Sequence, residues 1–184
     1  MQLHLIRHPP PLVAEGICYG ATDLPLRDDP AAIACTIQAQ LPPGLTFFTS
    51  PLMRCRLLAE ALHPAPLCDP RLQELNFGDW EMQMWEALDR AAINAWAENP
   101  VSYTPPQGES VNELQTRVHD FLAEQYARKI THAALVTHAG VMKVIVGLAQ
   151  GLAPAEWMAL KFGFGSVVHV QLTTTMMNGS LFRR

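Results

Sequence analysis

Short apolar runs alternate along this chain with longer stretches of helical periodicity. Apolar runs typical of buried strands occur at residues 3–7, 45–49, 133–137 and 166–173, with a short edge strand expected at 66–72. Apolar side chains three or four positions apart predict helices at residues 31–40, 79–97, 111–129, 140–150 and 154–160. Because strands separated by helices pair mainly in parallel, the pattern predicts an α/β fold, a three-layer α/β/α sandwich around a mostly parallel central sheet.

Capping residues mark the starts of two helices. Ser50 and Pro51 predict an N-cap and a first helical position, so Arg54 is expected in the first turn of the helix that follows. Ser110 and Glu113 have the spacing of a capping box, directly ahead of the long amphipathic helix at 111–129.

Composition and charge narrow the class of protein. With 184 residues, 49% hydrophobic and 16% charged, the chain is long enough to bury a sizeable core, and one domain over 1–184 is expected. A net charge of -4 disfavours nucleic acid and anionic membranes as partners, because both require clustered Lys and Arg. The N-terminal residues do not resemble a signal peptide, which predicts a cytoplasmic protein. The four cysteines lack paired metal spacing and are expected to be reduced thiols.

Two short segments that are far apart in the chain contain the candidate catalytic residues. Arg7 and His8 end the first predicted strand, and His138 ends the strand at 133–137. Because ligands of open α/β sheets bind outside the carboxyl ends of the strands, the two histidines are expected in one pocket, and Arg54 is expected to join them. Two guanidiniums, two imidazoles and the N–H groups of helix starts predict a small anion pocket, for which a phosphate monoester is the natural ligand.

A neutral imidazole can attack phosphorus, and His8 is the candidate nucleophile. Its other ring nitrogen is expected to be held by a backbone carbonyl, which would fix the tautomer. His138 is expected to donate to a phosphate oxygen. The leaving alkoxide needs a proton from a carboxyl group outside the phosphate cradle, and three residues compete for that role, namely Glu74, Asp79 and Glu81.

The remaining candidates are weaker. Tyr19, Thr22 and Trp80 are candidates for the leaving-group side of the pocket, although loop packing or helix capping explains each of them equally well. Ala139, next to His138, is a candidate substrate-binding residue. The sequence lacks the motifs of other phosphate-processing and metal-dependent enzymes. No cysteine has an arginine six residues later, and neither a GxxxxGK[ST] loop nor an HExxH motif is present.

Together these residues resemble the histidine phosphatase superfamily, also called the phosphoglycerate mutase-like family. Residues 5–8 resemble its Arg-His-Gly signature, residues 49–55 its Ser-x-x-x-Arg segment, and residues 136–140 its second histidine motif. Residues 72–81 resemble the segment that supplies the acid. The resemblance implies that His8 is the nucleophile and that Glu74, in preference to Glu81, is the proton donor. It also implies three phosphate ligands, namely Arg7, Arg54 and His138.

Within the superfamily, residues 17–26, 78–81 and 105–111 are similar to the α-ribazole-5'-phosphate phosphatases of cobalamin nucleotide-loop assembly. This resemblance implies a phosphomonoesterase that needs no metal or cofactor and acts on a small phosphorylated substrate through a phosphohistidine. A general small-molecule phosphatase and a phosphoglycerate mutase are the alternatives within the family. Its mutases are generally longer, with inserted segments, so hydrolysis is the expected reaction. A monomer or a homodimer is expected.

The sequence departs from the family pattern at two positions in the first motif. Pro9 replaces the glycine after the first histidine, and Ala14 replaces the usual asparagine. Pro9 has no N–H, so one backbone contact to phosphate is lost. Losing one such donor costs about 2–4 kcal/mol of transition-state stabilisation. A catalytically weakened phosphate-binding protein is therefore a further alternative.

Overall fold

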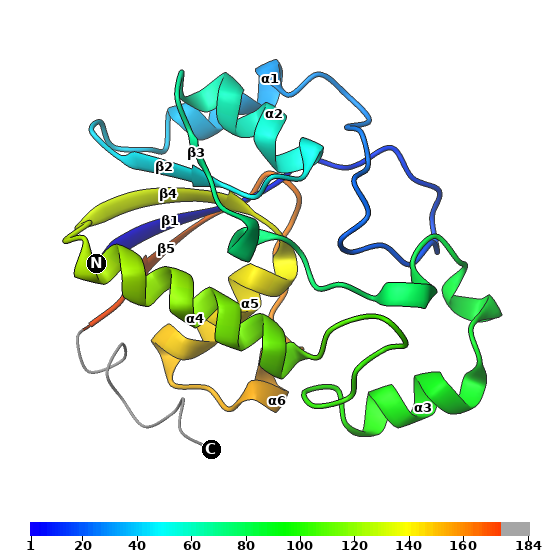
Figure 1. The fold of residues 1–184 in the computed structure, drawn as a ribbon. Coiled ribbons are helices and arrows are strands. Elements are labelled where there is room, and N and C mark those ends of the chain that lie inside the picture. The colour runs from blue at the N-terminus through cyan, green and yellow to red at the C-terminus, as the bar shows by residue number, and fades with distance from the viewer. Residues whose placement is uncertain (174–184) are drawn as a thin grey trace.

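The computed structural model describes residues 1–173, and its centre is a five-stranded sheet (Figure 1). The strands are β1 (Gln2–Arg7), β2 (Thr46–Thr49), β3 (Leu67–Cys68), β4 (His132–Thr137) and β5 (Val167–Gln171). Their order in the sheet is β3-β2-β4-β1-β5. The first four pair in parallel, whereas β5 runs antiparallel to β1 at the edge. The predicted mostly parallel sheet is confirmed.

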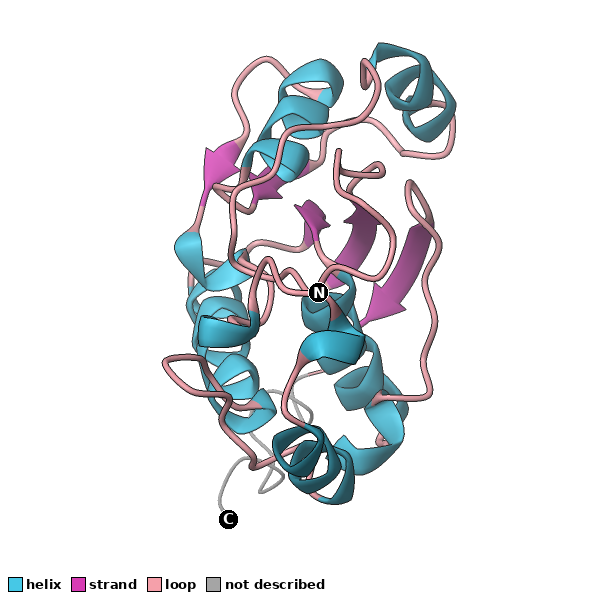
Figure 2. Cartoon of the chain, turned by 90° about the vertical axis from the view of Figure 1, so that its right-hand side faces the viewer, coloured by secondary structure: helices cyan, strands magenta, loops and turns pink. Residues whose placement is uncertain are grey.

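Helices cover both faces of the sheet, as Figures 1 and 2 show. They are α1 (Ala31–Gln38), α2 (Met53–Leu62), α3 (Arg90–Glu98), α4 (Val111–Ala127), α5 (Ala139–Gln150) and α6 (Pro154–Trp157). Neighbouring strand residues face opposite layers: Ile6 packs in the core under α1 and α2, and Leu5 packs in the core under α4 and α5. The predicted three-layer sandwich is confirmed. Within residues 1–173, none of the helices combines the length and apolar character needed to cross a membrane.

The helix predicted over 79–97 is confirmed only in its C-terminal half. The structure has two short 3-10 turns, at Gly78–Trp80 and Trp85–Ala87, and α3 begins only at Arg90. Met82, between the turns, has a φ of 65°, which no right-handed helix accommodates. The spacing of the tryptophans has another cause: Trp80, Trp85 and Trp96 form one cluster with Phe77, in which the rings of Trp85 and Trp96 stack at 5.8 Å.

The predicted cap of α2 is also wrong. The helix begins at Met53, so Ser50 and Pro51 precede it, and Arg54 still lies in its first turn. The carboxylate of Asp23, thirty residues earlier, accepts the N–H of Met53 at 2.6 Å. Ser50 instead contacts His138 at the edge where the strands end. By contrast, the capping box of Ser110 and Glu113 ahead of α4 is confirmed.

Gly147 permits the contact between α5 and α6, and its replacement gives a test of this packing. A Cβ at Gly147 would lie 2.2 Å from Cδ1 and Nε1 of the buried Trp157. Alanine favours helix over glycine by about 1 kcal/mol, but forced overpacking costs about 1–3 kcal/mol. Because so close an approach to a buried indole lies at the upper end of that cost, we expect Gly147→Ala to lower the free energy of unfolding by about 2 kcal/mol in urea titration, after the helix gain is subtracted. Gly163→Ala, where a Cβ meets open space, is the control and should change it by less than about 0.5 kcal/mol. A neutral Gly147→Ala would contradict this packing.

Candidate active site

The register of β1 on β4 brings the two candidate histidines together. Arg7 pairs with Thr137, so the residues that follow, His8 and His138, leave the sheet side by side. The backbone N–H of His8 donates to the carbonyl of Thr137 at 3.1 Å, and the two imidazole centroids lie 5.0 Å apart. The expectation that both histidines share one sheet edge is confirmed by this geometry.

The ring of His8 is buried and held in one tautomer. Its Nδ1 lies 2.6 Å from the carbonyl oxygen of Pro9. Because a carbonyl only accepts, Nδ1 carries the proton and Nε2 keeps its lone pair. Burial, together with the charges of Arg54 and Arg7, lowers the pKa of His8 to about 3, although the bond to Pro9 opposes this shift. His8 is therefore neutral at physiological pH with Nε2 available as a nucleophile.

His138 is fully buried at the start of α5, where it is the N-cap residue. Its Nε2 lies 2.8 Å from Ser50 Oγ and 3.3 Å from Cys55 Sγ. Burial, followed by the repulsion that a protonated His8 would exert and by the charge of Arg54, lowers the pKa of His138 well below its ordinary value. The ring is consequently neutral, and its orientation is set by side chains from the α2 region that the sequence motifs alone did not connect to it.

Arg54 is completely buried and donates to backbone carbonyls. Its Nη1 and Nη2 donate to the carbonyls of Thr22 and Gly20 at 2.8 and 2.5 Å. The ring of Tyr19 lies 5.7 Å from its guanidinium carbon. Among the described residues, the buried Nε of Arg54 has no hydrogen-bond partner. The loop that contains Tyr19 and Thr22 is thus connected to the site by its contacts with the Arg54 guanidinium.

Glu81 holds this loop in place. Its carboxylate accepts the N–H groups of Ala21, Thr22 and Phe77 at 2.6–2.9 Å, and the hydroxyl of Thr22 also donates to it. Burial disfavours the charged carboxylate, but these hydrogen bonds dominate and lower the pKa of Glu81 below its ordinary value. An ionised, fully engaged carboxylate is a poor proton donor, so Glu81 positions the loop. The side chain of Thr22 is occupied by the same contact.

Arg7 is covered by a segment that sequence reasoning missed. Its Nη1 donates to the carbonyl of Phe162 at 2.5 Å, and its guanidinium carbon lies 3.9 Å from the centroid of Phe164. The Phe164 ring also lies 5.5 Å from that of His8. Burial lowers the pKa of Arg7, and Tyr19 and Glu74 oppose this shift. The segment arrives here because β5 is antiparallel, so the chain entering β5 crosses the edge where β1 ends.

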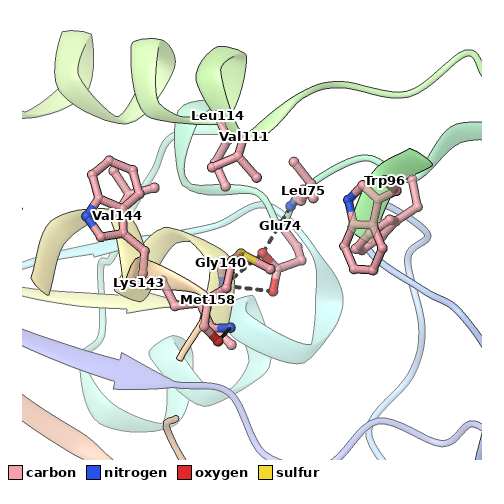
Figure 3. Close-up of a pocket in the computed structure, with 12 residues that line it drawn as sticks. Glu74, Leu75, Trp96, Val111, Leu114, Gly140, Lys143, Val144 and Met158 are labelled. Atoms are coloured by element: carbon pink, nitrogen blue, oxygen red, sulfur yellow. Dashed lines mark hydrogen bonds between the residues drawn. The ribbon is translucent and has the colours of Figure 1, made fainter. Parts of the chain in front are cut away.

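Of the three competing carboxyl groups, Glu74 is the one at this edge. Its carboxylate accepts the N–H of Gly140 at 3.0 Å and that of Leu75 at 3.0 Å (Figure 3). Gly140 follows His138 by two residues, and the charge of Glu74 acts on Arg7. Asp79 is exposed. Trp80 packs in the aromatic cluster and is not brought to the edge, whereas Ala139 lies beside Glu74 on the wall of a cavity.

The backbone that carries Glu74 is clamped by an ion pair. Arg117 on α4 donates to the carbonyls of Arg71, Gln73 and Glu74 at 2.7–3.0 Å. Its Nη2 also pairs with Oε1 of Glu109 at 2.5 Å, and we call Arg117 and Glu109 together the clamp. Five hydrogen bonds from one half-buried guanidinium, three of them to these carbonyls and two to Glu109, therefore determine where Glu74 lies. Arg117 sits on an amphipathic helix, where an arginine usually faces solvent, so its sequence position carried no signal.

The edge thus combines two guanidiniums, a neutral imidazole with a free Nε2, a second neutral imidazole and a carboxyl group. Such a set can bind a phosphoryl group, attack it and protonate a leaving oxygen. The model of the histidine phosphatase superfamily (branch 1) matches residues 3–178. The chain belongs to the histidine phosphatase superfamily. As a member, it is a phosphatase-type hydrolase with a small phosphorylated substrate.

Members of this superfamily from several organisms resemble the chain over most of its length. The adenosylcobalamin/alpha-ribazole phosphatase of Escherichia coli (strain K12) is 29% identical over 173 residues, which cover 86% of this chain and 83% of that protein. The crystal structure of a phosphoglycerate mutase from Thermus thermophilus is 35% identical, with a TM-score of 0.72 and 92% of both chains covered. The mycobacterial glucosyl-3-phosphoglycerate phosphatase Rv2419c, 24% identical, shares the fold with a TM-score of 0.80 over 91% of this chain and 88% of its own.

Removing the clamp should impair catalysis more than binding. We expect Arg117→Met to lower kcat about tenfold or more, because a small displacement of a catalytic group is costly, and to change KM by less than about threefold. Arg117→Lys should restore part of the loss. Arg128→Met, an exposed arginine at the end of the same helix, is the matched control. Equal losses in the two Met variants, or a change confined to KM, would contradict a positioning role.

The neutral state of His8 predicts acid destabilisation. Its pKa is lower in the folded protein, about 3, than its ordinary value of 6.5. The stability that neutral His8 contributes is therefore complete above about pH 6.5 and is lost as the pH falls toward about 3, at up to about 1.4 kcal/mol per pH unit. NMR should find the folded His8 ring neutral at about pH 5, and urea titrations should give a shallower loss of stability for His8→Gln. A His8 that titrates near its ordinary pKa in the folded state would refute this.

Proposed function

We propose that the chain is a metal-independent phosphomonoesterase that works through a phosphohistidine at His8. The observation that carries this proposal is the hydrogen bond from His8 Nδ1 to Pro9, which leaves Nε2 unprotonated close to the charges of two guanidiniums. A phosphate monoester carries about -1.5 to -2 charge at neutral pH, which Arg7 and Arg54 nearly neutralise. The two arginines supply the charge stabilisation that a metal ion provides in other phosphatases.

The reaction has two transfers. In the first, Nε2 of His8 forms a bond to phosphorus as the bond to the ester oxygen breaks, and the protonated form of Glu74 gives its proton to the leaving alkoxide, which leaves the carboxylate. In the second, water attacks the phosphohistidine, Glu74 takes a proton from that water, and the bond between nitrogen and phosphorus breaks. Inorganic phosphate and the original His8 result. His138 donates to a phosphate oxygen in both steps.

The leading substrate is α-ribazole-5'-phosphate. Support comes from the relative in Escherichia coli that bears this activity in its name and from the three similar segments at 17–26, 78–81 and 105–111. Phosphoglycerate mutase activity is the second candidate, favoured by the 35% identity to the Thermus thermophilus enzyme. A mutase requires a phosphorylated resting enzyme, whereas a phosphatase discharges its phosphohistidine to water.

Pro9 favours a third candidate, a phosphate-binding protein with weakened turnover. Its missing N–H removes a donor, but its carbonyl orients His8, so the substitution is compatible with an active nucleophile. The position of Glu74 supports turnover over mere binding, because a carboxyl group adds nothing to the affinity for an anion. Slow hydrolysis is therefore the expected consequence of Pro9.

Phosphate release in the presence of a chelator tests the proposal. The substrates are α-ribazole-5'-phosphate, sugar phosphates, nucleotides and phosphoglycerates. We expect His8→Ala to abolish release, and Glu74→Gln to lower it about 10²-fold or more while phosphate still binds. His132→Ala and Glu60→Gln, both at exposed residues, are the matched controls. Wild-type rates in His8→Ala would refute the nucleophile. Intact mass after exposure to a phosphodonor separates the mutase, which keeps the phosphoryl group, from the phosphatase.

A further inference from the structure

A cavity of about 170 Å³ opens beside Glu74, between the Glu74 segment, α4 and α5 (Figure 3). Apart from Glu74 and Lys143, the residues that line it are small or apolar: Leu75, Phe77, Trp96, Val111, Leu114, Ala139, Gly140, Val144, Trp157 and Met158. No step of the proposed reaction uses this space. Its walls combine two indole rings with aliphatic side chains, the lining typical of a site for an apolar ligand group.

The size and chemistry of the cavity limit what it can hold. A cavity of roughly 150 Å³ with an aliphatic and aromatic lining is large enough for benzene and stays dry without a ligand. The space beside Glu74 therefore suits one planar apolar ring. A polyhydroxylated group would leave its hydroxyls without partners against Trp157 and Leu114, and each unsatisfied group costs affinity.

The cavity adjoins the phosphate site through Glu74. Ala139 and Gly140, on its wall, directly follow His138 in the chain. The carboxylate of Glu74 forms part of the wall and accepts the N–H of Gly140 at 3.0 Å. Burial lowers the pKa of Lys143, the charge of Glu74 opposes this shift and the charge of Arg7 adds to it, so both groups lie within electrostatic range of the ammonium in the cavity wall. Because Glu74 lines the cavity, the alcohol of a substrate within reach of its carboxyl group lies beside this cavity.

Lys143 supplies a polar contact within the apolar lining. It is half-buried one turn after Gly140, and its Nζ donates to the carbonyl of Met158 at 3.0 Å. An ammonium carries three donors, and this contact uses one of them. A ring substituent with an acceptor atom can bind to another.

We propose that this cavity is the leaving-group site, and that it favours phosphomonoesters whose alcohol carries an apolar ring with a hydrogen-bond acceptor. It therefore favours a nucleotide-like ester such as α-ribazole-5'-phosphate, whose ring lies beyond its ribose, over phosphoglycerates, which carry no ring. The inference rests on the proposed function, because it assigns the cavity to the alcohol that Glu74 protonates. It adds the substrate class: the arginines and histidines recognise the phosphate common to all monoesters, and the cavity discriminates among their alcohols.

Two pairs of substrates test the preference. 2-Phenylethyl phosphate and 2-hydroxyethyl phosphate are both primary alkyl esters, so they differ little in leaving-group chemistry and differ in the ring. We expect kcat/KM to be at least about tenfold higher for the phenyl ester. The 2-(4-pyridyl)ethyl ester, which adds an acceptor to the ring, should exceed the phenyl ester in wild type and lose that advantage in Lys143→Met, but keep it in the exposed Lys161→Met control.

A cavity-filling variant locates the preference. Met158→Trp reduces the space, so the ratio of the phenyl to the hydroxyethyl rate should fall about tenfold. Met84→Trp, at an exposed methionine outside the cavity, should leave the rates and the ratio unchanged. Equal rates for the phenyl and hydroxyethyl esters in wild type, or the same fall in both tryptophan variants, would overturn the assignment.

A binding measurement keeps this test independent of turnover. Calorimetry should find 2-phenylethanol bound by wild type and by His8→Ala, and not by Met158→Trp. Absence of phosphate release from every ester, with 2-phenylethanol still bound in this pattern, would refute the proposed function and support the cavity as a ring-binding site. Phosphate release that depends on His8, without binding or preference for the ring, would refute the cavity assignment and leave the phosphatase proposal standing.

Discussion

Arg54 has no surface exposure, and its terminal nitrogens donate to the carbonyls of Gly20 and Thr22, with no carboxylate among the partners described. A carboxylate partner would have neutralised the guanidinium that an anion needs. Carbonyls orient it and leave its net charge intact. Glu81 fixes the loop that presents these carbonyls, and it does so without pairing with Arg54 in the part of the chain that the structure describes. The guanidinium therefore keeps its positive charge in a protein of net charge -4.

Burial, reinforced by the same positive charge, determines the state of the histidines. Burial and the two neighbouring guanidiniums keep both imidazoles neutral, and the bond to Pro9 selects the tautomer of His8 with a free Nε2. Binding of a phosphate dianion would offset part of this positive charge. The register of the sheet determines which groups meet at this edge. The strands β1, β2 and β4 end together because they are parallel neighbours, and the antiparallel strand β5 brings Phe162 and Phe164 from the opposite direction.

Patterns local to one segment were predictable from the sequence. Apolar runs within a few residues predict that strands end at Arg7 and at Thr137, just ahead of His8 and His138. Side-chain chemistry within one turn likewise predicts the capping box of Ser110. Features that depend on tertiary contacts were not. The cap of α2 comes from Asp23, and the helix expected over 79–97 is broken because its tryptophans pack against one another rather than along one helix face. The contacts of Arg117, Lys143 and Phe164 with the site could not be predicted, because the fold brings these residues to Glu74 and Arg7 from distant parts of the chain.

Glu74 lies between two environments with different requirements. On one side, charges that recognise any phosphate monoester bind the transferring group equally well whatever alcohol it carries, so they cannot provide selectivity. On the other side, an apolar cavity with one ammonium group favours only alcohols that fill it. Selectivity among monoesters must come from interactions that differ between them. On the proposed mechanism, the clamp of Arg117 on the backbone of Glu74 limits how far the acid can follow a poorly placed leaving oxygen. Occupancy of the cavity would then contribute to proton transfer as well as to affinity.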